Sequence, residues 1–205
     1  MSKPTRVMAA SGLLVAALVA QPPSAALAAE TSVAGVHMGF ETVDTRLRGN
    51  GWLVAGVAGQ ALQLDGIAAH VVVPAPDVPR IAGSFTVEGW VALGAYPFND
   101  APLLQQQDGE SVGFFLGVGD RGQVRFDVAA GGTVAAGGRR LSLTSAAHVP
   151  LRQWAHVAGV FEEGKGATLY VNGQPAGVAS GTGPFVQATR SDLWIGRNAY
   201  EMEQS

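Results

Sequence analysis

Two aromatic side chains and two polar ones lie side by side in the segment 96–100. Aromatic rings bind the apolar face of a sugar ring, and amide and carboxylate groups bind its hydroxyls. The segment follows a β-rich run that ends at Leu93, so we expect it to be a loop. The candidate carbohydrate-binding residues here are Tyr96, Phe98, Asn99 and Asp100. The alternative is that Tyr96 and Phe98 cap the edge of the fold.

A second cluster of similar chemistry lies near the end of the sequence. Arg197, Asn198 and Tyr200 combine a guanidinium group, an amide and an aromatic ring within a few positions. Guanidinium and amide groups donate hydrogen bonds to hydroxyl oxygens, and the ring offers a stacking surface. We therefore include these three residues among the candidate carbohydrate-binding residues.

Calcium is a better metal candidate than zinc, because Asp carboxylates in the loops of β-rich domains often bind a hard cation. Asp65 and Asp120 lie in turn sequences and are the candidate metal ligands. The alternative is that each simply forms its turn, since Asp-Gly is a common turn sequence. Any other cofactor is left unknown. His37, His70 and His148 have no partner at ligand spacing, so a histidine metal site is disfavoured.

The sequence contains no recognisable catalytic motif, and we predict no catalytic residue. Glycoside hydrolysis needs two carboxylates that flank the bond, and Glu88 has no such partner on its predicted strand. His156 could act as a metal ligand or a base, or could be a half-buried histidine bonded to a neighbouring strand. Nucleophile elbows and phosphate-binding loops are also absent from the sequence.

The first 29 residues have the pattern of a secretory signal peptide. Lys3 and Arg6 precede an uncharged run from Val7 to Ala20, and small residues follow up to Ala29. The alternative is an uncleaved anchor, but the run is shorter than the ~20 residues of a comfortable membrane span. No later apolar run is long enough either. We expect a secreted chain in which residues 30–205 form one domain.

Charge and cysteine content narrow the class of protein. Without Lys3 and Arg6, 11 basic and 16 acidic residues give a formal charge of −5, without a basic cluster. Nucleic acid is therefore excluded as an expected partner. The chain has no cysteine, so its core forms without disulfides.

The rest of the sequence predicts an all-β fold, because short apolar runs alternate with Gly, Pro, Asn and Asp. Asn172-Gly173 suits a two-residue hairpin turn, and the proline-rich segment 74–79 suits a crossover between sheets. Trp90, Trp154 and Trp194 lie on predicted strands and are expected in the core. The predicted strands are 35–41, 60–64, 69–73, 84–93, 102–107, 112–118, 124–129, 141–144, 154–161, 167–171 and 192–195.

Four sequence blocks occur in a family-specific order. They are Phe85-Thr86-Val87-Glu88-Gly89-Trp90-Val91, Trp154-Ala155-His156-Val157-Ala158, Leu169-Tyr170-Val171-Asn172-Gly173 and Leu193-Trp194-Ile195-Gly196. Over residues 33–198 the chain resembles the laminin-G-like, concanavalin-A-like lectin/glucanase domains of secreted bacterial proteins. The resemblance implies a two-sheet antiparallel jelly-roll sandwich. Lectins, adhesion modules and glycosidases all share this fold, so the resemblance fixes no single function.

In that family a closing strand follows the last block, and we expect this strand to be absent from the present sequence. The expected function is a noncatalytic carbohydrate-binding or domain-positioning module. Its expected partner is a glycan or a downstream catalytic domain such as a glycoside hydrolase. The alternatives are an adhesion module that binds no sugar, and a glycosidase, which the missing carboxylate pair disfavours.

Overall fold

The computed structural model describes residues 13–16, 37–42, 44, 46–108, 112–131 and 139–197. Nearly all regular structure in these ranges is β-strand, interrupted by the 3-10 turn η1 (Ala75–Asp77). The strands are β1 (Leu13–Ala16), β2 (Leu47–Arg48), β3 (Gly51–Ala55), β4 (Gln60–Leu64), β5 (His70–Val73), β6 (Phe85–Leu93), β7 (Ala101–Asp108), β8 (Val112–Val118), β9 (Gln123–Ala130), β10 (Arg139–His148), β11 (Ala155–Glu162), β12 (Gly166–Val171), β13 (Gln174–Ser180) and β14 (Leu193–Ile195).

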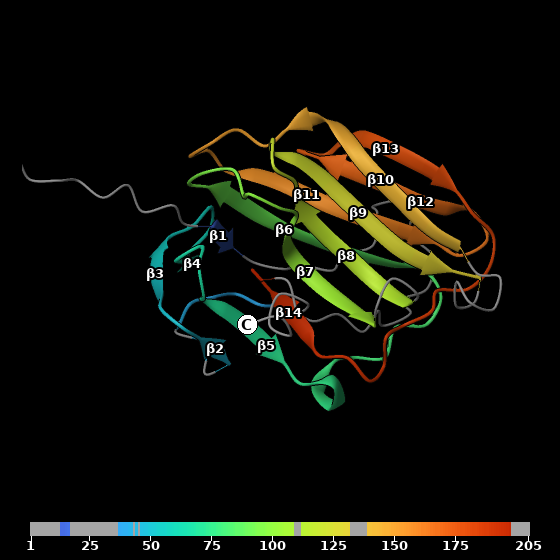
Figure 1. Ribbon diagram of the computed structural model, residues 1–205, viewed down its shortest axis with the longest axis horizontal. Coiled ribbons are helices and arrows are strands. Elements are labelled where there is room, and N and C mark those ends of the chain that lie inside the picture. Colours follow the sequence, from blue (N-terminus) through green and yellow to red (C-terminus); the bar gives the residue numbers. More distant parts are fainter. Residues whose placement is uncertain are drawn as a thin grey trace, which may run out of the picture.

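The described strands form two antiparallel sheets that pack face to face (Figure 1). The first sheet has the order β13-β12-β11-β6-β1-β4-β3, and the second has the order β10-β9-β8-β7-β14-β5-β2. Strands that are distant in sequence therefore pair in both sheets, as β14 does between β5 and β7. The predicted two-sheet antiparallel jelly-roll sandwich is confirmed.

Two connections have the local causes that the sequence predicts. Asn172 and Gly173 take φ angles of 50° and 75°, which the two-residue turn between β12 and β13 requires. The proline-rich segment 74–79 includes η1 and leads from β5 in the second sheet to β6 in the first. Because proline cannot donate a ladder hydrogen bond, this segment leaves one sheet and crosses to the other.

The core lies between the sheets and is filled from both inner faces. The rings of Phe85, Phe114, Phe161 and Phe185 cluster there, with centroids 4.5–6.4 Å apart. The backbone of β11 approaches the ring of Phe126 closely: a Cβ atom on Gly159 would lie 2.4 Å from that ring. A glycine at this position therefore sets how closely the two sheets pack.

The expectation that three tryptophans fill the core is wrong. Trp90, Trp154 and Trp194 are each only half-buried and do not belong to the core cluster. Their strand neighbours Val91, Ala155 and Leu193 point inward and are 0–6% exposed. Alternation along a strand separates two faces but does not say which one is buried.

Strand prediction missed β2, β3 and β13. The segment that contains β2 and β3 is rich in glycine, which has a low strand propensity, so no strand is predicted there from the sequence. Residues 37–41, predicted as part of the first strand of the domain, contain one isolated bridge at Met38 instead. The rest of that predicted strand lies outside the described residues.

Four residues of the predicted signal peptide form β1, in the middle of the first sheet. β1 is antiparallel to β4 on one side and to β6 on the other. The remaining leader residues, including the expected cleavage site, lie outside the described residues. The chain has no helix, within the described ranges, with the length and hydropathy that crossing a bilayer requires.

Candidate functional site

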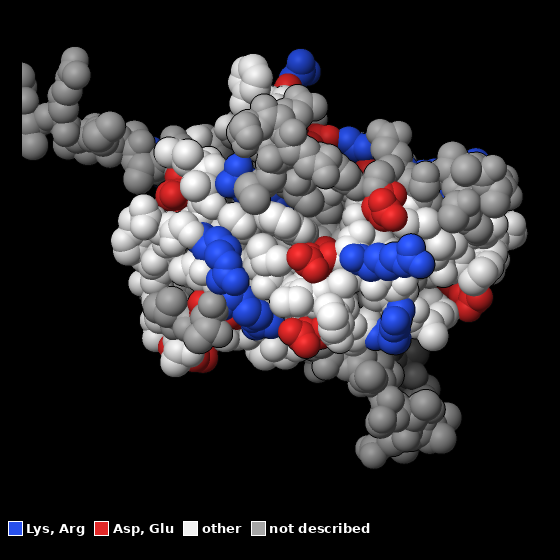
Figure 2. All heavy atoms as spheres, turned by 60° about the horizontal axis from the view of Figure 1, so that its bottom comes forward, with Lys and Arg blue, Asp and Glu red and all other residues white. Residues whose placement is uncertain are grey.

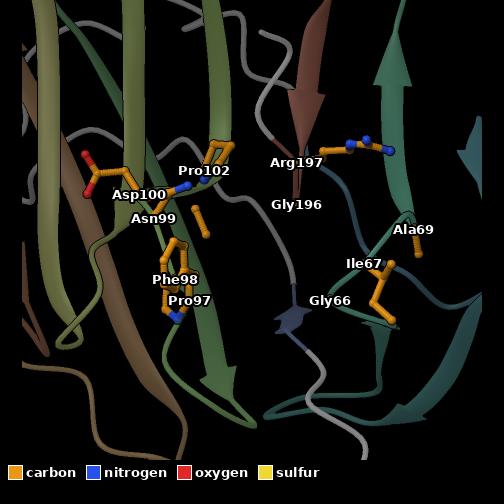
Figure 3. A pocket seen from close by; sticks show the side chains of 11 residues that line it. Gly66, Ile67, Ala69, Pro97, Phe98, Asn99, Asp100, Pro102, Gly196 and Arg197 are labelled. Carbon is orange, nitrogen blue, oxygen red and sulfur yellow. The ribbon is translucent and has the colours of Figure 1, made fainter. Parts of the chain in front are cut away.

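Three segments that are far apart in the sequence enclose a shallow pocket of about 220 Å³ (Figure 3). They are the turn between β4 and β5, the loop from β6 into β7, and the residues after β14. The lining residues are Gly66, Ile67, Ala69, Pro97, Phe98, Asn99, Asp100, Ala101, Pro102, Gly196 and Arg197. Since β5, β14 and β7 are neighbours in the second sheet, their pairing brings the segments together.

A single carboxylate shapes the first wall of the pocket. Asp65 Oδ1 accepts hydrogen bonds from the backbone N–H groups of Ile67, Ala68 and Ala69 at 2.8–2.9 Å. Partial burial alone would raise the pKa of Asp65, but these three donors together with the backbone N–H of Asp65 itself outweigh it and hold the pKa below its ordinary value. Asp65 therefore fixes the turn that presents Ile67.

Two large apolar side chains face each other across the opening of the pocket. Phe98 is 95% exposed and Ile67 is 84% exposed. In Figure 3 Phe98 stands on the wall formed by residues 97–102, and Ile67 stands on the opposite wall. Leaving both side chains in water has a hydrophobic cost that a ligand covering them would remove.

A chain of ion pairs anchors the second wall. Arg125 pairs with Asp100 and, at 2.8 Å, with Asp127 Oδ2, which also lies 3.2 Å from Arg140 Nη2. The Asp127 side chain is only 2% exposed, so its charge depends on these two partners. The Asp100 carboxylate consequently points away from the pocket toward β9, as Figure 3 shows.

The third segment depends on a glycine. Gly196 has a φ of 84°, and a Cβ atom there would lie 2.0 Å from Leu64 Cδ1. The absence of a side chain lets the chain pass over β4 and place Arg197 at the rim. Arg197 Nε is buried without a hydrogen-bond partner among the described residues. A buried donor of this kind favours an acceptor from outside the protein.

The two clusters of predicted carbohydrate-binding residues partly meet in this pocket. Phe98, Asn99 and Asp100 from the first cluster and Arg197 from the second line it together. Tyr96 does not line it. The Tyr96 ring packs against Gly122 instead, so closely that a Cβ atom on Gly122 would lie 2.4 Å from Tyr96 Cε1. Asn198 and Tyr200 lie outside the described residues. Sequence reasoning missed Ile67, whose only signal was an apolar residue directly after Asp65-Gly66.

The predicted metal ligands Asp65 and Asp120 lie in separate turns. Asp120 Oδ1 accepts one long hydrogen bond from Gln123 Nε2, at 3.4 Å. Across the ranges that the structure describes, no group of three or more His, Cys, Asp or Glu side chains is placed to hold a metal ion. The role of these two carboxylates in calcium binding stays a prediction.

His156 lies on the outward face of the first sheet. Its Nε2 atom is 3.3 Å from Glu88 Oε2, and its ring is 5.2 Å from that of Trp90. The backbone N–H of His156 donates to Asn172 Oδ1 at 2.9 Å. These contacts match the interpretation of a half-buried histidine bonded to neighbouring strands.

Charges of both signs are mixed on the face shown in Figure 2. A short stripe of basic side chains lies on this face, and acidic side chains lie beside it and between the other basic ones.

Taken together, the antiparallel sandwich and its loop pocket define a lectin-like β-sandwich domain. The chain belongs to the concanavalin A-like lectin/glucanases superfamily, whose family model matches residues 65–205. The resemblance drawn from the four sequence blocks is therefore confirmed. A search of curated proteins finds no match.

Several solved structures share the fold at low identity. One is domain 4 of AbnA, a GH43 extracellular arabinanase from Geobacillus stearothermophilus, in complex with arabinotriose (TM-score 0.55, 15% identity, 74% of this chain and 68% of that one). Another is the binding domain of Paraclostridial Mosquitocidal Protein 1 (0.51, 15%, 79% and 45%). A third is the binding domain of Botulinum Neurotoxin DC in complex with SialylT (0.51, 14%, 80% and 41%). This chain thus spans less than half of either toxin binding domain.

Proposed function

We propose that this protein is a secreted, noncatalytic carbohydrate-binding module whose site is the pocket between Phe98 and Ile67. The observation that carries the proposal is the pair of exposed apolar side chains, 95% and 84% exposed, on opposite sides of one pocket. Polar groups of Asn99 and Arg197 line the same pocket. This combination of apolar surface and a few polar groups suits a sugar ring.

The size of the pocket supports recognition of a short stretch of glycan. Its volume of about 220 Å³ is below the ~300–1,000 Å³ of pockets that enclose a drug-sized ligand. One sugar ring would stack on Phe98 and contact Ile67. Its hydroxyls would accept from Arg197 and exchange hydrogen bonds with the Asn99 amide, while the rest of the glycan stays in solvent.

The charges of the pocket support binding rather than hydrolysis. Asp100 is the one carboxylate among the lining residues, and it pairs with Arg125. Hydrolysis by the usual route needs a second carboxylate across the glycosidic bond, ~5–9.5 Å away. The proposed module therefore leaves any catalysis to another domain, such as a glycoside hydrolase in the same protein.

Two further observations support this context. The sequence pattern of residues 1–29 supports export with removal of the leader. Among the structural neighbours, one arabinanase domain was solved with arabinotriose and one toxin binding domain with SialylT. Both are glycans, so sugar binding is the function to test first.

The test is affinity electrophoresis of the full chain in gels that contain arabinan, xylan, β-glucan or fructan. Phe98→Ala removes the proposed stacking surface, and Val178→Ala, on the edge strand β13, is the control because Val178 is also exposed, at 72%. Covering about half of a phenylalanine contributes ~1 kcal/mol, so Phe98→Ala should weaken retention roughly fivefold. The Arg197→Ala variant should weaken retention about tenfold or more, because an unreplaced hydrogen bond to a charged donor costs ~1.5–3 kcal/mol.

Retention by one polysaccharide that Phe98→Ala reduces and Val178→Ala leaves unchanged would support the proposal. Equal retention of all variants would contradict the assigned site. If no glycan retards the chain, the exposed rim of Phe98 and Ile67 instead fits the alternative, a surface that docks a protein domain.

A further inference from the structure

Arg197 gives one side of the pocket a positive charge. We propose that the sugar unit held between Phe98 and Ile67 carries a carboxylate, as the ring of a uronic acid does, and that Arg197 binds this carboxylate. The inference rests on the proposed function and adds the chemical class of the sugar. A neutral sugar would leave the charge of Arg197 without a counter-ion.

The guanidinium group of Arg197 is unpaired within the described part of the chain. No hydrogen bond or ion pair joins it to another described residue, and its Nε atom is buried without a partner. By contrast, Arg46 and Arg125 each hold a carboxylate, at 2.6 and 2.8 Å. Partial burial of an unpaired guanidinium is costly, and an anion from outside the protein would remove this cost.

The other charge of the pocket is already neutralised. Asp100 pairs with Arg125, which also pairs with Asp127. Arg140 is the second partner of Asp127. Two carboxylates and two guanidinium groups thus balance each other in this chain of ion pairs. Since Asp100 and Arg197 are the charged residues among those that line the pocket, the uncompensated charge that a ligand meets there is positive.

The shape of the guanidinium group favours a carboxylate over a single hydroxyl. Nε and one terminal nitrogen lie on one edge of the group, spaced to donate two parallel hydrogen bonds to the two oxygens of a carboxylate. Nε of Arg197 is covered, so the group turns about its outer side-chain bonds to offer this edge. Because Arg197 makes no hydrogen bond or ion pair with a described residue, this turn breaks none.

A uronic acid places its charge where the pocket can reach it. Its carboxylate is attached directly to the sugar ring, so a ring stacked on Phe98 holds the charge within the same pocket of about 220 Å³. In Figure 3 the side chains of Phe98 and Arg197 lie on different walls, so a ring on the first can direct its carboxylate toward the second. The Asn99 amide stays available for the ring hydroxyls.

The net charge of the chain does not favour anions at long range. Residues 30–205 carry 11 basic and 16 acidic residues, a formal charge of 11 − 16 = −5, which repels an anion at low salt. At ~0.15 M salt, exposed charges more than about 8 Å apart are largely screened. Contact with Arg197 then decides the preference, and binding is measured at that salt concentration.

The experiment measures the binding of short oligosaccharides to the full chain by calorimetry. The probes are trigalacturonate and trimannuronate, each compared with its methyl ester, which keeps the sugar rings and removes the charge. Arg197→Met keeps most of the side-chain stem without the guanidinium, and Arg197→Lys keeps the charge without the planar edge. Phe98→Ala removes the stacking surface. Arg139→Met is the control, because Arg139 is exposed on the edge strand β10 and does not line the pocket.

At least one of the two acids should bind the wild-type chain about tenfold or more tightly than its ester, as expected for hydrogen bonds to a charged donor. Arg197→Met should reduce this ratio to about one, and Arg197→Lys should keep part of it. Arg139→Met should leave the ratio unchanged. Phe98→Ala should weaken acid and ester alike, by about fivefold, and so preserve the ratio.

A ratio near one for both sugars in the wild-type chain would overturn the inference, and so would a ratio that survives in Arg197→Met. Absence of binding by both acids would overturn it as well. The proposed function is tested separately, by Phe98-dependent retention in the gels of neutral polysaccharides. Such retention, with equal binding of acid and ester, would contradict the charge preference alone. If no glycan of either kind binds in a way that depends on Phe98, the proposed function fails too.

Discussion

The turn that Asp65 holds in place offers a sharp test of how the pocket is built. Asp65→Ala removes the acceptor of three backbone N–H groups, whereas Asp65→Asn keeps an oxygen in the same place and removes its charge. Asp120→Ala is the matched control, because Asp120 also lies in a turn but accepts, within the described part of the chain, a single hydrogen bond of 3.4 Å.

The expected size of the effect follows from the three hydrogen bonds. Loss of one capping acceptor at a helix N-terminus costs about 0.5–2 kcal/mol. Two of the three bonds at Asp65 are exposed, so water replaces part of them and the total should lie near 2 kcal/mol. For a chain of this size that loss lowers the Tm by about 4–8 °C. Asp120→Ala should change the free energy of unfolding by less than about 0.5 kcal/mol.

The pH dependence provides an independent check of the same contact. The backbone donors lower the pKa of Asp65 in the folded state. Its charge therefore contributes stability above the unfolded-state pKa of ~3.9, and this contribution is lost as the pH falls through the folded-state pKa. The difference in unfolding free energy between wild type and Asp65→Asn should be constant near neutral pH and should close below about pH 4.

Urea unfolding at several pH values measures these differences, and glycan retention of the same variants measures the pocket. Asp65→Ala should lose retention together with stability, because the turn no longer presents Ile67, whereas Asp65→Asn should keep most of both. A wild-type-to-Asn difference that stays unchanged down to pH 3 would refute the electrostatic argument. If Asp65→Ala behaves like Asp120→Ala, the turn does not depend on this carboxylate. Calcium added to each variant tests the predicted metal role, since a bound ion would raise the Tm of wild type and not of Asp65→Asn.

Two other positions test packing and charge. Gly159→Ala should destabilise the fold by about 1–3 kcal/mol, because its Cβ would lie 2.4 Å from the Phe126 ring. Phe126→Leu should recover part of that loss in the double variant. If the free-energy changes of the two single variants simply add in the double variant, the proposed clash is contradicted. Arg125→Met should cost about 1–3 kcal/mol, because Asp127, with a side chain 2% exposed, keeps only Arg140 of its two ion-pair partners. Arg121→Met, at an exposed position, is the control for Arg125→Met. Equal urea midpoints for these two variants would refute the argument from the Asp127 ion pairs.

The sequence predicts strands well where apolar residues alternate between good turn residues. The bounds of β4 and β8 agree with the predicted ranges, and Asn172-Gly173 forms the expected turn. The weak points have physical causes. β3 lies in a glycine-rich segment whose strand arises from pairing with β4 rather than from local propensity. The inward faces of the tryptophan-bearing strands depend on the opposite sheet, which no local pattern contains.

The candidate site shows the same division between local and distant information. The aromatic and polar residues of the 96–100 loop could be identified from their chemistry alone. That Arg197 lines the same pocket as Phe98 depends on β14 pairing next to β7, which is a long-range event. The exposure of Ile67 could not be predicted either, because an isolated isoleucine in a turn is more often buried.

The insertion of β14 between β5 and β7 also sets an order of events during synthesis. β14 is the last described strand to leave the ribosome, and until it pairs, the pocket lacks Gly196 and Arg197. Long-range pairing of this kind is slow compared with hairpin formation. A nascent or proteolytically shortened chain thus has its aromatic loop but not its third wall. If the proposed site binds a glycan, a glycan column should therefore separate molecules that contain residues 196–197 from molecules truncated before β14.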